Sequence, residues 1–284
     1  MTAQPQVEPL RDTLPYLIRG GRLGRERLRV LARATRPTTA ALLDRVGVPA
    51  GARCLDVGCG GGDVTLELAA RAGVGSRVVG VDVDGQQLAV ARAEAAAAGQ
   101  AVEYVQADVT TGDLGTGYDL AYVRFLLTHL VDPAAACERI LAAVRPGGTV
   151  IVEDIDVPGS FCHPDSAAFQ RYLTVYEATA LARGGDPRIG RRLPGLLRAA
   201  GFERVRVWAA QPLGAAPSGV EGDVKLVAPL TLEGIADAAV AEGIAERSEL
   251  AAVTDELHRL SADPGTLVSL PRIVQAAARR PEED

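Results

Sequence analysis

The chain has 284 residues, of which 48% are hydrophobic and 23% are charged, a composition typical of a globular protein with a full core. Its net charge of −6 argues against a nucleic-acid-binding protein, because such proteins normally carry a basic surface. No stretch approaches the roughly 18 apolar residues of a membrane-spanning helix, and the polar first residues do not resemble a signal peptide. The four cysteines, Cys54, Cys59, Cys137 and Cys162, form no C-x-x-C pair, which favours reduced thiols in a cytoplasmic protein.

The first 48 residues predict an arm followed by helices. Residues 1–15 contain three prolines and little periodicity, so we expect them to lack regular structure. An amphipathic helix is predicted over residues 24–34, and the sequence around Pro37 predicts that it breaks there. A second short helix is predicted over residues 39–46.

Strands and helices then alternate up to residue 153. The pattern predicts strands over residues 53–57, 78–82, 102–106, 120–123 and 149–153, with helices over 63–70, 86–98 and 133–144. Asp63, Asp84 and Asp132 are expected to cap these three helices in turn, the last followed by proline at its first position. This alternation indicates a doubly wound α/β fold with a mostly parallel sheet and helices on both faces.

The alternation fails after the fifth strand. We expect residues 157–190 to be irregular, followed by a helix over 193–200, a strand over 204–208, two helices within 231–262 and a last strand over 267–276, where Pro271 marks an edge or a bulge. The predicted organisation is therefore a helical arm or lid (1–48), a core (49–213, with 157–190 as an insertion), a helical cap (214–263) and a last strand with a tail (264–284).

The motif Asp56-Val57-Gly58-Cys59-Gly60-Gly61-Gly62 follows the first strand and is the most informative part of the chain. Glycines let the backbone turn sharply and approach a ligand, and the helix behind them points its positive end at that ligand. The next strand ends in Asp82, an acid suited to the hydroxyls of a ribose. Together these features predict a nucleoside pocket.

The nucleoside is identified by what the motif lacks. In the dinucleotide fingerprint G-x-G-x-x-G the third glycine would fall on Asp63, whose carboxylate would repel a pyrophosphate. No phosphate-binding Walker pattern exists, and the only lysine is Lys225. The motif resembles instead the first motif of class I S-adenosylmethionine-dependent methyltransferases, whose cofactor carries an ammonium and a sulfonium but no phosphate.

Four further motifs of that family occur in order between about residues 50 and 155: Asp82, Asp108, the segment 118–124 and the turn 145–148. The chain resembles bacterial small-molecule methyltransferases of the ubiquinone/menaquinone-biosynthesis-like group. This resemblance implies a Rossmann-like, seven-stranded sheet, S-adenosyl-L-methionine as cofactor and S-adenosyl-L-homocysteine as product. It implies that the cofactor is bound by Tyr16 and Arg19 of the lid and by Asp56, Gly58, Cys59, Gly60, Asp82, Val83, Asp108, Val109 and Arg124.

Each of these residues also has a simpler interpretation. Asp82 and Asp108 are ribose and adenine ligands or, alternatively, turn residues. Asp56 either binds amides of the glycine turn or reaches the cofactor ammonium through water. Cys59 is interpreted as a packed thiol rather than a nucleophile, and Arg124 as a contact to the cofactor carboxylate or a structural residue.

Methyl transfer mainly requires alignment, and a general base is needed only when the acceptor must lose a proton. His129 after the fourth strand and Asp154 and Asp156 after the fifth are the catalytic candidates, with a structural histidine as the alternative for His129. Strand alternation places Glu153 and Ile155 on one side and the two aspartates on the other, one pair being solvated or ion-paired. No metal site is expected.

The leading hypothesis is a cytoplasmic enzyme that methylates O, N or C of a small, partly apolar metabolite in biosynthesis, including secondary metabolism. Its acceptor pocket is expected from the lid, the insertion with Phe161, Phe169, Tyr172 and Tyr176, and the cap helices. Nucleobase methylation is disfavoured because the segment 124–127 lacks the Asn/Asp-Pro-Pro-Tyr/Phe motif. We expect a small-molecule substrate, no nucleic-acid or membrane partner, and a monomer or homodimer. The alternatives are a cyclase or isomerase that keeps S-adenosylmethionine bound, and an NAD-dependent oxidoreductase.

Overall fold

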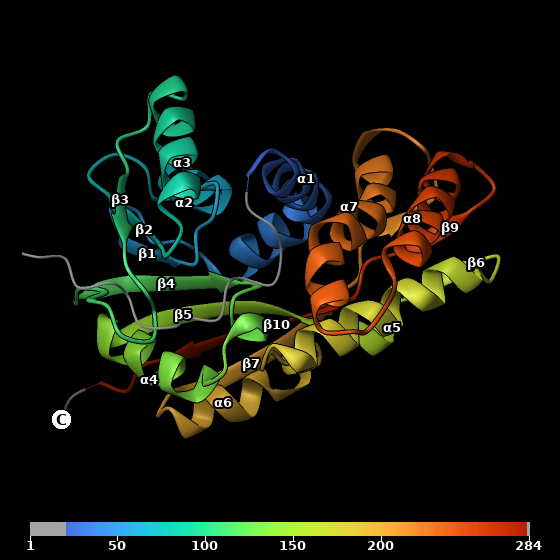
Figure 1. Ribbon diagram of the computed structural model, residues 1–284. Coiled ribbons are helices and arrows are strands. Elements are labelled where there is room, and N and C mark those ends of the chain that lie inside the picture. The colour runs from blue at the N-terminus through green and yellow to red at the C-terminus, as the bar shows by residue number, and fades with distance from the viewer. Residues whose placement is uncertain (1–20, 283–284) are drawn as a thin grey trace, which may run out of the picture.

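A seven-stranded sheet forms the centre of the computed structural model, which describes residues 21–282 (Figure 1). The strand order is β3-β2-β1-β4-β5-β10-β7. The strands are β1 (Arg53–Val57), β2 (Arg77–Asp82), β3 (Glu103–Gln106), β4 (Tyr118–Arg124), β5 (Val144–Asp156), β7 (Glu203–Ala210) and β10 (Arg272–Arg279). The first five are parallel, and β10 runs antiparallel between β5 and β7. The predicted Rossmann-like, mostly parallel sheet is therefore confirmed.

Helices cover both faces of this sheet. Figure 1 shows α2 (Asp63–Ala72) and α3 (Gly85–Ala97) above it and α4 (Pro133–Ala143) and α6 (Leu193–Ala199) below it. Two expected caps are present: Asp84 Oδ1 accepts from the amide of Gln86, and Asp132 Oδ1 accepts from the amide of Ala135. The cap expected from Asp63 was wrong, because α2 begins at Asp63 itself, after Gly62, and has no side-chain cap. The carboxyl ends of β1, β2, β4 and β5 consequently lie at one edge of the sheet, where the predicted site residues gather.

The first described element, α1 (Gly21–Val46), is one helix that contains Pro37, so the predicted break was wrong. Pro37 is exposed, and because proline has no amide hydrogen, the carbonyl of Arg33 one turn earlier loses its usual helical donor. Tertiary packing holds the helix together on either side of the proline. Val30 and Ala34 pack against α7 (Gly219–Ala241), whereas Leu42 and Leu43 pack against the sheet.

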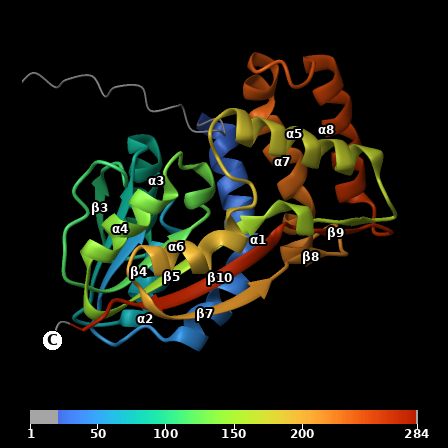
Figure 2. The same cartoon turned by 90° about the horizontal axis from the view of Figure 1, so that it is seen from below.

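Three further helices gather at one end of the molecule, beyond the sheet (Figure 2). They are α5 (Ala167–Ala182), α7 and α8 (Arg247–Ala262), and they share an apolar cluster that includes Phe169, Tyr172, Leu232 and Leu257. The expectation that residues 157–190 are irregular was therefore wrong. Ser166 Oγ caps α5 by accepting from the amide of Phe169, and the buried aromatic residues hold this helix against α7 and α8.

Pro271 separates two strands, so the single predicted strand over residues 267–276 was wrong. β9 (Leu267–Ser269) joins β6 (Cys162–His163) and β8 (Leu213–Gly214) in a small sheet, while β10 is an inner strand of the main one. The proline falls between them, where no ladder hydrogen bond is required. The 3₁₀ turns η1 (Leu127–His129), η2 (Val157–Gly159) and η3 (Ile189–Arg192) complete the connections.

All four cysteines are buried and unbridged, as expected. None of the helices between residues 21 and 282 combines the length and the apolar character that crossing a lipid bilayer requires.

Candidate active site

The chain turns sharply between β1 and α2. Gly58, Gly60 and Gly62 all have positive φ angles, of 72°, 51° and 84°. A side chain at Gly62 would collide with the hydroxyl of Tyr104, so this position requires glycine for its space as well as its backbone angle. The turn leads into Asp63 at the start of α2, whose carboxylate gives this helix end a negative charge.

Asp82 connects the end of β2 to the glycine turn. Its Oδ2 accepts from the amide of Gly60 at 2.8 Å, and its Oδ1 accepts from the amide of Asp84 at 2.9 Å. Burial raises the pKa of this carboxyl, while the backbone hydrogen bonds oppose the rise. The next residue, Val83, is 48% exposed, which leaves an apolar surface beside the turn.

Asp56 is buried behind the turn, where its Oδ2 accepts from the hydroxyl of Thr65 at 2.7 Å. Burial raises the pKa of Asp56 to about 7, and the hydrogen bond from Thr65 opposes that rise. The contact with Thr65 differs from the expected contacts with amides of the turn. Cys59 packs against Leu88 and Ala91, and burial raises the pKa of its thiol, as suits the packed thiol that we expected.

Asp108 and Val109 follow β3 at the same edge of the sheet. Asp108 Oδ1 accepts from both the amide and the hydroxyl of Thr110, each at 2.7 Å, so one carboxylate oxygen closes a local turn. Val109 is buried in the main core. The turn interpretation of Asp108 is observed, and adenine contact stays a prediction.

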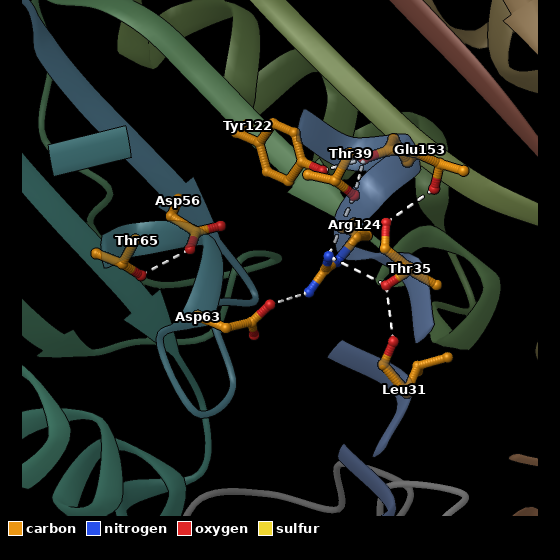
Figure 3. A network of polar contacts seen from close by, with 10 residues as sticks. Leu31, Thr35, Thr39, Asp56, Asp63, Thr65, Tyr122, Arg124 and Glu153 are labelled. Atoms are coloured by element: carbon orange, nitrogen blue, oxygen red, sulfur yellow. Dashed lines mark hydrogen bonds and ion pairs between the residues drawn. The ribbon is translucent and has the colours of Figure 1, made fainter. Parts of the chain in front are cut away.

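Arg124, at the end of β4, joins the glycine turn to α1 (Figure 3). Its Nη2 forms an ion pair with Asp63 Oδ2 at 2.5 Å, and its Nη1 donates to Thr39 Oγ1 at 3.2 Å. A weaker contact of 3.4 Å runs from Nη1 to Thr35. Arg124 is thus held by structural contacts on both sides, beside the turn expected to bind the cofactor.

Arg124 and Thr39 lie at the contact between α1 and the sheet, which we call the seam. The seam also contains a fully buried carboxylate, Glu153 of β5. It accepts from Thr39 Oγ1 at 2.8 Å, from Gln275 Nε2 at 2.6 Å and from the hydroxyl of Tyr122. These donors come from α1, β10 and β4, so Glu153 ties the first helix to three adjacent strands of the sheet. A carboxylate with this many donors is structural rather than available to a substrate.

His129 stands on η1, directly after β4, and lines a cavity of about 50 Å³. Arg27 of α1, Tyr172 of α5 and Thr231 of α7 line the same cavity. Burial, with a smaller contribution from the charge of Arg27, lowers the pKa of His129 to about 3. The imidazole is therefore neutral at neutral pH, the form that can accept a proton.

Asp154 and Asp156 do not line this cavity within the described part of the chain, unlike His129. Asp154 accepts from the amides of Thr128 and Ile155, at 3.1 and 2.8 Å, and burial raises its pKa to about 7. Asp156 forms ion pairs with Arg191 at 2.5 Å and with Arg272 at 3.3 Å. These contacts hold η1 and η3 against the sheet and do not favour the catalytic roles expected for the two aspartates.

Sequence reasoning missed Arg27, Thr231 and Phe125, which line the cavity together with the predicted Tyr172 and Tyr176. Arg27 and Thr231 are 204 positions apart, and no local pattern links them. Phe125 has a φ of 54°, a conformation that residues other than glycine rarely adopt and that clusters at functional sites. Tyr16 and Arg19, predicted in the lid, lie outside the described residues.

The site suits S-adenosylmethionine better than a phosphate-bearing cofactor. Three carboxylates, those of Asp56, Asp63 and Asp82, stand at or behind the glycine turn, where an ammonium group is favoured and a pyrophosphate is repelled. Across residues 21–282 no cluster of three or more His, Cys, Asp or Glu side chains could hold a metal ion.

The sheet order and the glycine turn define the fold of class I S-adenosylmethionine-dependent methyltransferases. Residues 54–148 match the family model described as a methyltransferase domain.

Curated relatives share part of the chain. A ubiquinone biosynthesis O-methyltransferase of Aeromonas salmonicida is 35% identical over 117 residues, 40% of this chain and 48% of the relative. The O-methyltransferase cnsE of Penicillium expansum is 34% identical over 168 residues, 57% of this chain and 56% of the relative. The chain spans about half the length of these relatives.

Solved structures with a similar fold have different activities. The [4+2]-cyclase SpnF aligns with a TM-score of 0.53 at 21% identity, over 87% of this chain and 82% of that one. Phosphoethanolamine N-methyltransferase 2 of Haemonchus contortus, in complex with S-adenosyl-L-methionine, aligns with a TM-score of 0.52 at 19% identity, over 91% and 53%. At these identities the likeness shows the fold alone, and the reaction must be argued from the site.

Proposed function

We propose that the chain is a methyltransferase that uses S-adenosylmethionine to methylate a small, partly apolar metabolite, with oxygen as the favoured acceptor atom. One observation carries this proposal: the segment 124–129 links the glycine turn to the cavity. Arg124 pairs with Asp63, Leu126 lies against Gly58, and Phe125 and His129 line the cavity. The names of the curated relatives support oxygen as the acceptor.

In this proposal the turn from Gly58 to Gly62 lies against the methionine part of the cofactor, while Asp82 and Val83 hold its ribose and adenine. Asp108 and Val109 complete the adenine side. When bound, the cofactor supplies a methyl group on a sulfonium, which is already an effective leaving group. The protein therefore has to orient the acceptor and exclude water.

His129 is the residue that we assign to proton removal from an acceptor hydroxyl. It lines the cavity and is neutral, and the carboxylate of Asp154 fixes the turn that carries it by accepting the amide of Thr128. Asp154 is then a positioning residue, and Asp156 is another that acts through Arg191. The low pKa of His129 makes it a weak base, and the positive charge of Arg27 contributes to that low pKa.

The proposal includes a biosynthetic role, secondary metabolism among the options, in the cytoplasm. The net charge of −6 supports a small-molecule substrate rather than a nucleic acid. We propose a monomer or homodimer as the working form.

The test is transfer of label from S-adenosylmethionine with a tritiated methyl group to a panel of small phenols, carboxylic acids and amines. We expect labelled product from at least one class. Conversion of an acceptor without label would overturn methyl transfer and favour a cyclase or isomerase that only keeps the cofactor bound. Calorimetry with S-adenosylhomocysteine and with NAD distinguishes a methyltransferase, cyclase or isomerase from an oxidoreductase, since we expect S-adenosylhomocysteine to bind and NAD not to bind.

Two substitutions test the assigned residues. Asp82→Ala should weaken S-adenosylhomocysteine binding about tenfold or more, because a hydrogen bond to a charged group contributes roughly 1.5–3 kcal/mol. Unchanged affinity would remove Asp82 from the ribose role. His129→Ala should reduce turnover while leaving the affinity for S-adenosylhomocysteine intact, and unaltered turnover would exclude it as the base.

A further inference from the structure

Arg27 is a buried cation in the wall of the cavity. It belongs to α1, is 8% exposed, and donates from Nε to the hydroxyl of Thr231 on α7 at 3.1 Å. Within residues 21–282 no other acceptor engages its guanidinium, and no carboxylate lies within ion-pair distance of it. A desolvated guanidinium with a single hydroxyl partner is incompletely satisfied.

Two arginines on the same helix show the contrast. Arg29 pairs with Glu94 at 3.0 Å and Arg33 pairs with Asp223 at 2.7 Å, although both arginine side chains are more than half exposed. These two exposed arginines thus have acidic partners, and the buried arginine that faces the cavity has none among the described residues. Because burial makes an unpaired charge costly, the missing anion is expected on the cavity side.

The charge of Arg27 acts on the groups across the cavity. It adds to the effect of burial in lowering the pKa of His129 on η1. At Tyr172 on α5, burial raises the pKa to about 12 and the charge of Arg27 opposes that rise. The remaining walls are largely apolar or aromatic, with Leu31, Phe125, Ile155, Tyr176 and Val227 among them.

We propose that Arg27 binds a carboxylate carried by the acceptor, so that the substrate is a small aromatic or similarly flat acid. This inference rests on the proposed function and names the substrate class of the same site. The carboxylate would satisfy the guanidinium, and the apolar walls would contact the flat body. The anion would also offset the charge that weakens His129 as a base.

The size of the cavity adds a requirement. About 50 Å³ holds a few water molecules, whereas ligand pockets commonly measure roughly 300–1,000 Å³. An aromatic acid therefore enters only when α1 shifts relative to α5 and α7. Because Arg27 stands on α1, pairing with the carboxylate draws this helix back over the acceptor.

The test is calorimetric binding, in the presence of S-adenosylhomocysteine, of benzoate, 4-hydroxybenzoate, 3,4-dihydroxybenzoate and cinnamate, each paired with its neutral primary amide. We expect the wild-type protein to bind at least one acid ten times more tightly than its amide. Arg27→Gln should reduce this preference to within about twofold, and Arg27→Lys should retain part of it. Arg29→Gln, on the exposed side of the same helix, is the matched control and should change nothing.

Two results would overturn the inference: no acid preferred by the wild-type protein, or a preference that survives in Arg27→Gln. Affinity for S-adenosylhomocysteine, measured in the same variants, reports the integrity of the fold. A failure of the proposed reaction can be distinguished from a failure of the carboxylate site. An acid preference that depends on Arg27, without label transfer, would contradict the reaction but support the carboxylate site. Methylation of amides that bind as tightly as the acids would have the opposite meaning: it would support the proposed reaction and contradict the carboxylate site.

Discussion

The glycine turn and the acceptor cavity are assembled in different ways. The turn is held by partners close in sequence: Gly60 and Asp82, which it binds, are 22 positions apart. The cavity is closed by α1, α5 and α7, and its bond between Arg27 and Thr231 spans 204 positions. A compact local unit can keep its cofactor while the distant helices change, which is how one fold accommodates many acceptors.

The strongest test of the turn is Gly62→Ala. A methyl group at this position would collide with Tyr104, and the φ of 84° is unfavourable for alanine. Backbone strain of about 1–2 kcal/mol and overpacking of about 1–3 kcal/mol should lower the free energy of unfolding by about 2–5 kcal/mol. Denaturant titration measures this loss, and calorimetry with S-adenosylhomocysteine should show greatly weakened binding.

Gly61→Ala is the matched control one residue earlier. A Cβ atom there meets nothing within 4 Å, and its φ is not positive. We expect stability and cofactor affinity close to those of the wild-type protein. Equal losses in both variants would mean that the turn is sensitive to any side chain, and the specific role of Gly62 would be wrong.

The pH dependence of stability tests the role of Asp154, which accepts from η1, part of the segment that links the glycine turn to the cavity. Burial raises its pKa to about 7, so the folded protein retains a proton that the unfolded chain releases above about pH 4. The free energy of unfolding should therefore fall as the pH rises from about 4 to 7 and level off above 7, with a total loss of at most about 4 kcal/mol for a shift of about three units. In Asp154→Asn this contribution should be absent, while the contribution of Asp56, whose pKa burial also raises to about 7, should remain, so that the slope becomes shallower.

Denaturant titrations between about pH 4 and 8 provide the measurement. Asp113→Asn changes an exposed carboxylate and should leave the slope of the wild-type protein unaltered. A slope in Asp154→Asn that equals the wild-type slope would show that Asp154 is already ionised in the folded protein.

The same contrast explains what could be predicted from the sequence. The glycine turn, the strand ending in Asp82 and the caps at Asp84 and Asp132 depend on neighbours in the chain, and all were found. Strand alternation correctly separated Ile155 from Asp154, but it carries no information about which helix packs on either side. It could not show that Asp154 accepts from the amide of Thr128 or that Asp156 pairs with Arg191, and the catalytic roles expected for the two aspartates stay predictions.

Two other features could not be predicted from the sequence, because they too depend on contacts between distant residues. Pro37 normally ends a helix, yet α1 continues because Ala34 and Leu42, on either side of it, pack against different parts of the molecule. Arg27 could not be identified as a cavity residue, because it is one of several arginines in an amphipathic helix. The sequence does not show that the hydroxyl of Thr231 on α7 lies beside it. Long-range burial decides these cases, and a single sequence does not display it.

Thr39→Val tests the seam that joins α1 to the cofactor side. The hydroxyl of Thr39 donates to Glu153 at 2.8 Å and accepts from Arg124 at 3.2 Å. Removing it leaves a buried acceptor with one donor fewer, which should cost about 1–3 kcal/mol of unfolding free energy. Hydrogen exchange should show α1 opening more often, while α2 and α3 stay protected.

Thr38→Val is its control, because the hydroxyl of Thr38 only donates to a carbonyl of its own helix, that of Thr35. Its effect should stay below about 0.5 kcal/mol. If both variants were equally stable, the seam between Thr39, Glu153 and Arg124 would contribute nothing to the position of α1.

The smallest effect is expected at the surface contact between α1 and α7, where Arg33 binds Asp223 with two hydrogen bonds of 2.8 and 2.7 Å. Arg33→Gln should lower the free energy of unfolding by about 0.2–1 kcal/mol, and 1 M salt should reduce the difference because exposed charges are screened. Arg77→Gln, which removes the exposed pair with Glu103 between β2 and β3, is the matched change on the cofactor side. If the two regions are energetically separate, Arg33→Gln will leave the affinity for S-adenosylhomocysteine unchanged. A loss of that affinity would show that the contact between α1 and α7 is coupled to the glycine turn.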